Sequence, residues 1–190
     1  KEWMFDISNG FDIVIGNPPY VLLQEKIKDL EKLKYFKSNY ITAVFKVDLY
    51  HLFIEKGLKL LSSNGILSFI NPSNFQTNNY TETLRNLILT NYQLSNIVNF
   101  EDDVFDASVN TCVIIIKNQR PINNILSFNN ANFINGKLEI KLISNQLQDN
   151  YLKNDSNVLQ PIKNETSNLL IKKIENKGVP IKRIGKVNLR

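Results

Sequence analysis

The clearest pattern in the chain is a pair of short apolar runs, each followed by a polar or proline-containing loop. Phe11–Gly16 (FDIVIG) is β-branched and ends in a glycine, which is typical of a buried parallel strand. Ile66–Ile70 (ILSFI) predicts a second buried strand, which Asn71-Pro72 should end because proline cannot donate to a sheet ladder. Between them, Val21–Val47 is rich in Lys and Glu and predicts a loop with a short helix.

Helical spacing of apolar residues predicts a helix over Leu49–Leu61. Asp48 precedes it as an expected N-cap, and Val47 and Leu52 are placed to form a hydrophobic staple around that cap. The helix should stop near a turn at Asn64-Gly65.

A second helix should follow the second strand. Asn79 and Glu82 have the spacing of a capping box at its start, and it runs towards Asn91. The order strand, helix, strand, helix predicts a right-handed parallel α/β sheet. Ile97–Phe100 and Thr111–Lys117 then read as two strands with no helix between them, so they are expected to be antiparallel neighbours.

The character of the sequence changes after Asn118. Ile125–Phe128 and Lys137–Ile143 are short strand candidates among Asn-rich turns, which predicts a small peripheral β hairpin. Asn164 is expected to cap a final helix.

Composition narrows the possible chemistry. The chain has 190 residues, 43% hydrophobic and 22% charged, as in globular proteins. With one cysteine, Cys112, and one histidine, His51, the chain alone cannot form a Cys/His zinc cluster. Cys112 is interpreted as a small buried residue, and His51 as a packing or surface histidine rather than a base. Glu101, with the acidic residues at 102, 103 and 106, is interpreted as part of a solvated loop rather than a metal site.

Charge and hydropathy bear on partners and location. The net charge of +5 suits a polyanionic partner but does not require one, because Lys and Arg scattered over solvated faces give the same total. The longest apolar runs, such as Val113–Ile116, are far too short to span a membrane, and the first residues lack the apolar run of a secretory signal. A cytoplasmic location is therefore expected.

The motif with most information is Asn17-Pro18-Pro19-Tyr20, directly after the first strand. The two prolines make the segment a stiff extended arm that donates few backbone hydrogen bonds. The Asn17 side-chain oxygen and the Pro18 carbonyl are acceptors that can converge on an external NH₂ group, and Tyr20 offers a flat face to a planar ligand. Ligands bind at the carboxyl ends of such strands, so we interpret the arm as a receptor for an aromatic or amide amine.

FDIVIGNPPY resembles motif IV of the S-adenosylmethionine-dependent amino-methyltransferases, and the chain as a whole resembles an N6-adenine DNA methyltransferase of type IIG restriction-modification enzymes. Three further segments, in order, are similar to motifs V, VI and VIII of that family: DLYHLFIEKGLKLL from Asp48, NGILSFINPSNF over Asn64–Phe75, and Val104-Phe105. The resemblance runs from about Phe11 to Lys117. It implies a partial Rossmann-like methyltransferase sheet, with parallel strands and an antiparallel C-terminal pair.

The resemblance also implies roles for residues. Asn17, Pro18, Pro19 and Tyr20 would form the catalytic arm, and Tyr20 and Phe105 would stack on a flipped-out adenine in double-stranded DNA. The methyl donor would be S-adenosylmethionine, with no metal.

The family's glycine-rich cofactor turn, which lies upstream of the arm, is missing from this chain, so the cofactor-binding residues are unknown. We therefore expect residues 1–118 to be the C-terminal half of a methyltransferase domain. Residues 119–190 would add the hairpin, the helix and the lead-in to a target-recognition domain. Such a half-domain should be inactive alone and leave a sheet edge open at Phe11–Gly16, which makes self-association there plausible.

Two other functions remain open at this point. Asn-Pro-Pro-Tyr also occurs in amine methyltransferases that act on protein glutamine or on ribosomal RNA guanine. A non-catalytic DNA-binding scaffold that keeps the fold is the third interpretation, although folding alone gives no reason to retain the arm.

Overall fold

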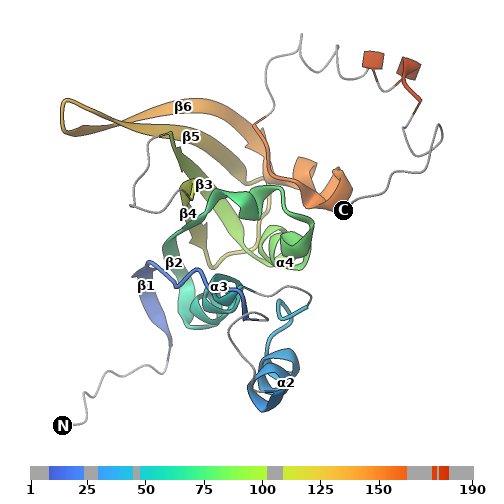
Figure 1. Ribbon diagram of the computed structural model, residues 1–190. Coiled ribbons are helices and arrows are strands. Elements are labelled where there is room, and N and C mark those ends of the chain that lie inside the picture. The colour runs from blue at the N-terminus through green and yellow to red at the C-terminus, as the bar shows by residue number, and fades with distance from the viewer. Residues whose placement is uncertain are drawn as a thin grey trace.

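The computed structural model describes residues 9–23, 30–44, 48–101, 109–161, 173–174 and 176–179 (Figure 1). Its helices and strands, in chain order, are β1 (Phe11–Gly16), α2 (Leu30–Asn39), α3 (Leu49–Lys59), β2 (Leu61–Pro72), α4 (Glu82–Asn91), β3 (Gln93–Phe100), β4 (Thr111–Lys117), β5 (Ile125–Ile134) and β6 (Lys137–Leu147). Short 3-10 turns at Ser73–Gln76 and Asn79–Thr81 lead from β2 into α4. Two more, Gln148–Lys153 and Asp155–Asn157, follow β6.

The six strands in the described part of the chain form one mixed sheet in the order β1-β2-β4-β3-β5-β6. Strands β1 and β2 are parallel, which confirms the predicted parallel pair. Strand β4 runs antiparallel to both of its neighbours, β2 and β3, so the predicted antiparallel pair is also confirmed. The carboxyl ends of β1, β2 and β3 therefore lie at one edge of the sheet.

Strand β2 is longer at both ends than predicted. The Asn64-Gly65 turn does not precede the strand but bulges within it, with Asn64 in the left-handed region at φ 65°. Pairing with β1 passes from Phe11↔Leu61 to Ile13↔Ile66, so β2 holds three extra residues there. Pro72 does not end the strand early, because it occupies the last paired position, where it faces Thr111 of β4.

The starts of the helices differ in detail from the predicted caps. Helix α4 begins after Thr81, and the predicted capping box at Asn79 and Glu82 is wrong. Thr81 is the N-cap residue of α4 and makes no side-chain cap bond, whereas Asn78 caps the preceding 3-10 turn, where its Oδ1 accepts from the Tyr80 N–H at 2.9 Å. Asp48 occupies the N-cap position of α3 as predicted, but its carboxylate makes no cap hydrogen bond. Val47 of the predicted staple lies outside the described residues.

The predicted hairpin is present as β5 and β6, with strands longer than expected (Figure 1). Strand β5 also pairs in parallel with β3, so the hairpin continues the main sheet. Asparagines that suggested turns occupy strand positions instead. Asn129, for example, donates from Nδ2 to Asn96 Oδ1 of β3 at 3.2 Å. The division at residues 118 and 119 stays a prediction. The predicted cap Asn164 lies outside the described residues, whereas residues 173–174 and 176–177 are helical.

The main core lies between the sheet and helices α3 and α4. Ile54 and Leu58 of α3, with Leu84 and Ile88 of α4, are at most 2% exposed and belong to one apolar cluster with the inner face of the sheet. The positions are spaced as a helix face requires, so the two helices cover the same side of the central strands.

Strand β1 lies at the edge of the sheet and is not buried as predicted. Val14 packs on the core, but Ile13 and Ile15 on the opposite face are 67% and 78% exposed. Because alternate residues of a strand face opposite sides, nothing among the described residues covers that outer face. The predicted self-association through this open edge stays a prediction. None of the helices in the described part of the chain combines the length and the apolar character needed to cross a membrane.

Candidate active site at the carboxyl edge of the sheet

The Asn17–Tyr20 arm leaves the sheet at the carboxyl end of β1, as the sequence predicts. Gly16 is the last residue of β1 and pairs with Phe69 of β2, so the arm begins beside the end of β2. Pro18 is buried, whereas Asn17 and Pro19 are exposed. The asparagine side chain is thus accessible on an arm whose base is packed into the protein.

Tyr20 ties the end of the arm to two other elements. Its hydroxyl donates to the Ile70 carbonyl of β2 at 3.1 Å, and its ring meets the Tyr50 ring of α3 edge-on, with centroids 6.2 Å apart. Burial raises the pKa of Tyr20 to about 12, so the hydroxyl stays protonated and able to donate at neutral pH. The predicted stacking of Tyr20 on a base stays a prediction.

The residue after the arm is held by the start of α3. Val21 donates its N–H to Asp48 Oδ1 at 2.7 Å and accepts at its carbonyl from the Leu49 N–H at 3.0 Å. Leu22 and Asp48 form an antiparallel bridge at the same place. The carboxylate that the sequence assigns to capping α3 therefore bonds to the residue that follows the arm.

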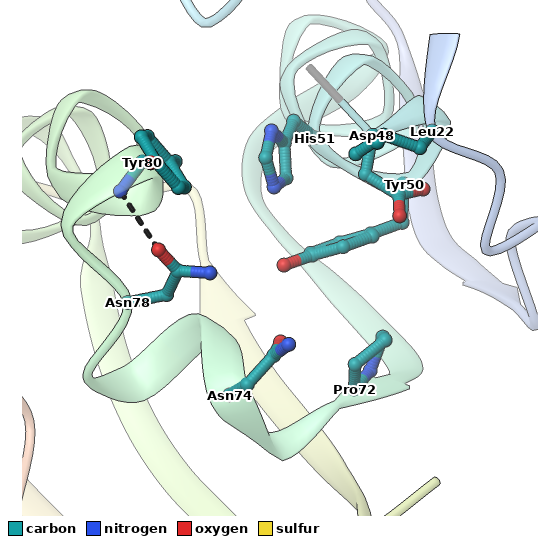
Figure 2. Close-up of a pocket in the computed structure, with 8 residues that line it drawn as sticks. All are labelled: Leu22, Asp48, Tyr50, His51, Pro72, Asn74, Asn78 and Tyr80. Carbon is teal, nitrogen blue, oxygen red and sulfur yellow. Dashed lines mark hydrogen bonds between the residues drawn. The ribbon is translucent and has the colours of Figure 1, made fainter. Parts of the chain in front are cut away.

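A cavity of about 210 Å³ lies at this edge of the sheet (Figure 2). Eight residues line it: Leu22, Asp48, Tyr50, His51, Pro72, Asn74, Asn78 and Tyr80. Figure 2 shows Asn74 and Asn78, on the loop after β2, facing Tyr50 and His51 of α3 across the opening. The cavity is thus bounded by the two segments that follow the carboxyl ends of β1 and β2.

The ionisable groups of this cavity are shifted by burial. His51 is 3% exposed, and burial lowers its pKa to about 4, so the imidazole is neutral at pH 7. Its ring contacts the Tyr50 ring with centroids 4.3 Å apart, which confirms a packing rather than a surface histidine. Burial raises the pKa of Tyr50, and it also raises that of Asp48, against the lowering effect of backbone N–H groups. The cavity thus combines neutral aromatic, imidazole and amide groups with one carboxylate.

Arg85 holds the loop that carries Asn74 and Asn78. This fully buried side chain of α4 donates from Nη1 to the carbonyls of Phe75 and Asn78, each at 2.7 Å, and to the Thr81 hydroxyl. From Nη2 it donates to the Ser156 carbonyl at 2.7 Å. One guanidinium therefore fixes the loop wall of the cavity against the segment after β6.

Two predicted features involve residues that the structure does not describe. Phe105 lies outside the described residues, as do the acidic residues at 102, 103 and 106. Glu101 is exposed and accepts hydrogen bonds from the amides of Asn130 and Asn132, which suits a solvated loop charge. Cys112 is fully buried as predicted, and burial raises its pKa to about 12. In the described part of the chain no cluster of three His, Cys, Asp or Glu residues could hold a metal ion.

Asn74, Asn78 and Tyr80 were not predicted as cavity residues, and the bond from Asp48 to Val21 was not predicted either. Asn74 had a signal, since NPSNF directly follows the apolar run Ile66–Ile70, whereas Asn78 and Tyr80 lie beyond that segment. The Asp48 contact had none, because it joins residues 27 positions apart and a local pattern shows only the capping alternative.

The sequence model of the Eco57I restriction-modification methylase family matches residues 1–105. The chain belongs to this family. It is 30% identical over 182 residues to the type II restriction enzyme and methyltransferase RM.Eco57I of Escherichia coli, covering 92% of this chain and 18% of that protein. It is 40% identical over 110 residues to the type II methyltransferase M.BstVI of Geobacillus stearothermophilus, covering 54% of this chain and 19% of that protein. The chain therefore spans less than a fifth of either relative.

Solved structures agree with the fold expected for the Eco57I family. The methyltransferase subunit of a type I restriction-modification system from Streptococcus thermophilus superposes with a TM-score of 0.60 at 18% identity, covering 83% of this chain and 39% of that one. The type IIG restriction endonuclease BpuSI superposes with a TM-score of 0.58 at 17% identity, covering 87% of this chain and 22% of that one. The predicted methyltransferase fold and the type II restriction-modification resemblance are both confirmed.

Proposed function

We propose that this chain forms the target-base part of a longer DNA adenine-N6 methyltransferase of a type II restriction-modification system. One observation supports the proposal most: in a member of the Eco57I family, an exposed Asn17 stands on a tethered arm at the carboxyl end of a parallel strand. That is the edge at which open α/β sheets bind ligands. A net charge of +5 is compatible with a DNA partner.

In the proposed reaction the arm orients a weak nucleophile, the adenine N6 amine. The lone pair of adenine N6 is delocalised into the ring, which makes the amine a poor nucleophile. The Asn17 Oδ1 atom and the Pro18 carbonyl would accept the two N6 hydrogens and favour a more tetrahedral nitrogen, with its lone pair aimed at the methyl group. Tyr20 and Phe105 would stack on the extruded base and so replace the stacking that the base loses when it leaves the duplex.

S-adenosylmethionine would supply an electrophilic methyl group. No two of the seven glycines of the chain are closer than six positions, so the sequence holds no glycine-rich turn that could cradle this cofactor. We therefore assign no cofactor contact to the described residues. Calorimetry should find no saturable binding of S-adenosylmethionine to this chain alone, and tight binding would show that the cofactor site has been misplaced.

The reaction is tested by methyl transfer from labelled S-adenosylmethionine with a full-length enzyme that contains this chain. DNA, ribosomal RNA and protein are offered in parallel, and the products are digested to identify the labelled group. Label in N6-methyladenine of DNA is the expected result. Label in RNA guanine or protein glutamine would select another amine methyltransferase, and DNA binding without any transfer would select a scaffold; either outcome overturns the proposal.

A further inference from the structure

The start of α3 holds the residue that follows the arm. Asp48 has the extended backbone of an N-cap residue, with φ −93° and ψ 145°, yet its side chain makes no cap hydrogen bond. Its Oδ1 accepts instead from the Val21 N–H at 2.7 Å. The backbone N–H groups of Leu49 and Tyr50, in the first helical turn, also act on this carboxylate and lower its pKa, so the bond to Val21 is made in addition to that local attraction.

The grip on Val21 has two points. The Leu49 N–H donates to the Val21 carbonyl at 3.0 Å, and Leu22 continues the contact through its antiparallel bridge with Asp48. Both backbone polar groups of Val21 are thus held by the first residues of one helix. A peptide fixed at both groups cannot rotate independently of α3.

This grip acts on the arm because the chain between it and β1 is short and stiff. Pro18 and Pro19 have fixed φ angles, and Tyr20 is tied to the Ile70 carbonyl. The arm is therefore held by β1 at one end and by the Asp48 carboxylate at the other. Loss of the second attachment should let the acceptors of Asn17 and Pro18 shift relative to the sheet.

We propose that Asp48 is a positioning residue for the target amine, which acts through Val21 and does not touch the substrate. This inference rests on the proposed function, since it assigns the orientation of the arm to a residue of α3. The required property is the acceptor oxygen rather than the charge. Burial raises the pKa of this half-buried carboxyl group, so the environment does not favour the charge.

Helix α3 also offers a matched control. Glu55, 1% exposed, accepts from the Thr42 N–H at 3.0 Å, from the Thr42 hydroxyl at 2.8 Å and from the Ile41 N–H at 3.3 Å. It is a carboxylate of the same helix that holds a backbone loop, but that loop is not the arm. Removing it should affect folding without a selective effect on methyl transfer.

The test compares Asp48→Ser, Asp48→Asn and Glu55→Ala in the full-length enzyme, with kcat, KM for DNA and melting temperature measured for each. Serine is a good helix N-cap but is shorter than aspartate. It should therefore keep α3 stable while losing the hydrogen bond to the Val21 N–H. We expect Asp48→Ser to lower kcat by about 10-fold or more through misplacement of the arm, with little change in KM. Asp48→Asn keeps an acceptor oxygen and should recover most of kcat. Glu55→Ala should lower the melting temperature and leave kcat per folded enzyme unchanged.

Wild-type kcat in Asp48→Ser would overturn the positioning role. Equal losses in Asp48→Asn and Asp48→Ser would also overturn it, because the charge and not the acceptor would then matter. A wild-type enzyme that modifies no adenine would instead overturn the proposed function, so the two failures are distinguishable.

Discussion

The Tyr20 hydroxyl donates to the Ile70 carbonyl at 3.1 Å and extends the pairing of β1 with β2 beyond the end of the ladder. The last paired residues of these strands are Gly16 and Phe69, and Ile70 is the next residue of β2. The Tyr20 side chain thus makes a hydrogen bond to β2 just beyond the last backbone pair of the two strands. The arm leaves the sheet after β1 but stays attached to β2 through one aromatic side chain.

Tyr20→Phe should show how much this bond contributes. It removes the hydroxyl and keeps the ring, so we expect a loss of about 1 kcal/mol in the free energy of unfolding, typical of one hydrogen bond. The drop in kcat should be modest, whereas Tyr20→Ala should cost about 1–3 kcal/mol of base binding through lost stacking. Steady-state kinetics and chemical unfolding measure both. Equal kinetic losses in the two variants would mean that the hydroxyl, not the ring, serves the reaction.

Arg85 should be among the residues to which the fold is most sensitive. Its guanidinium makes six hydrogen bonds, five of them to backbone carbonyls. Arg85→Met removes the guanidinium from the Ser156 and Asn157 carbonyls and leaves Thr81 as the donor to those of Phe75 and Asn78. We therefore expect a loss of about 3–5 kcal/mol in the free energy of unfolding. Arg120 is exposed and provides the control, because Arg120→Met should change that free energy by less than about 0.5 kcal/mol. Equal effects in urea denaturation would contradict the role of Arg85.

His51 should make stability depend on pH in the acid range. Burial lowers its pKa from 6.5 to about 4. Between pH 6.5 and pH 4, His51 is therefore largely protonated in the unfolded chain and neutral in the folded one. The free energy of unfolding should therefore be unaffected by His51 above about pH 6.5. It should fall as the pH drops towards 4, by about 3 kcal/mol at most.

The contribution of His51 is isolated with His51→Phe, which keeps a ring against Tyr50 but cannot titrate. Urea denaturation of both proteins from pH 8 to pH 4.5 gives the difference in slope. The wild-type chain should lose more stability on acidification than the variant. Parallel pH profiles would show that His51 is not held neutral by the fold.

Most strands could be predicted because their signal is local. β1, β2 and β4 are β-branched apolar runs, and the parallel and antiparallel pairings follow from whether a helix joins consecutive strands. The bulge at Asn64 could not be predicted, because Asn-Gly is a turn signal in any context and only the partner strand determines where pairing resumes.

The part of the site that lies within one continuous segment of the chain could be predicted. The arm at Asn17–Tyr20 stands where the sequence places it, at the carboxyl end of β1. The bond from Asp48 to Val21 was not predictable, because an N-cap preference and a distant acceptor role look alike in sequence. The exposure of Ile15 is a related case, since burial of a strand depends on what packs against it.

The central claim is that Asn17 presents the adenine amine through its side-chain oxygen. Asn17→Ala removes the acceptor, and Asn17→Asp keeps one. Because Asn17 is exposed, neither change should shift the free energy of unfolding by more than about 0.5 kcal/mol.

The most direct measurement is therefore single-turnover formation of N6-methyladenine in DNA by full-length wild-type, Asn17→Ala and Asn17→Asp enzymes at matched DNA occupancy. We predict a loss of about 100-fold or more for Asn17→Ala, as for removal of one preorganised group at a reacting centre, and a smaller loss for Asn17→Asp. Wild-type rates in Asn17→Ala, with DNA still bound, would contradict the account.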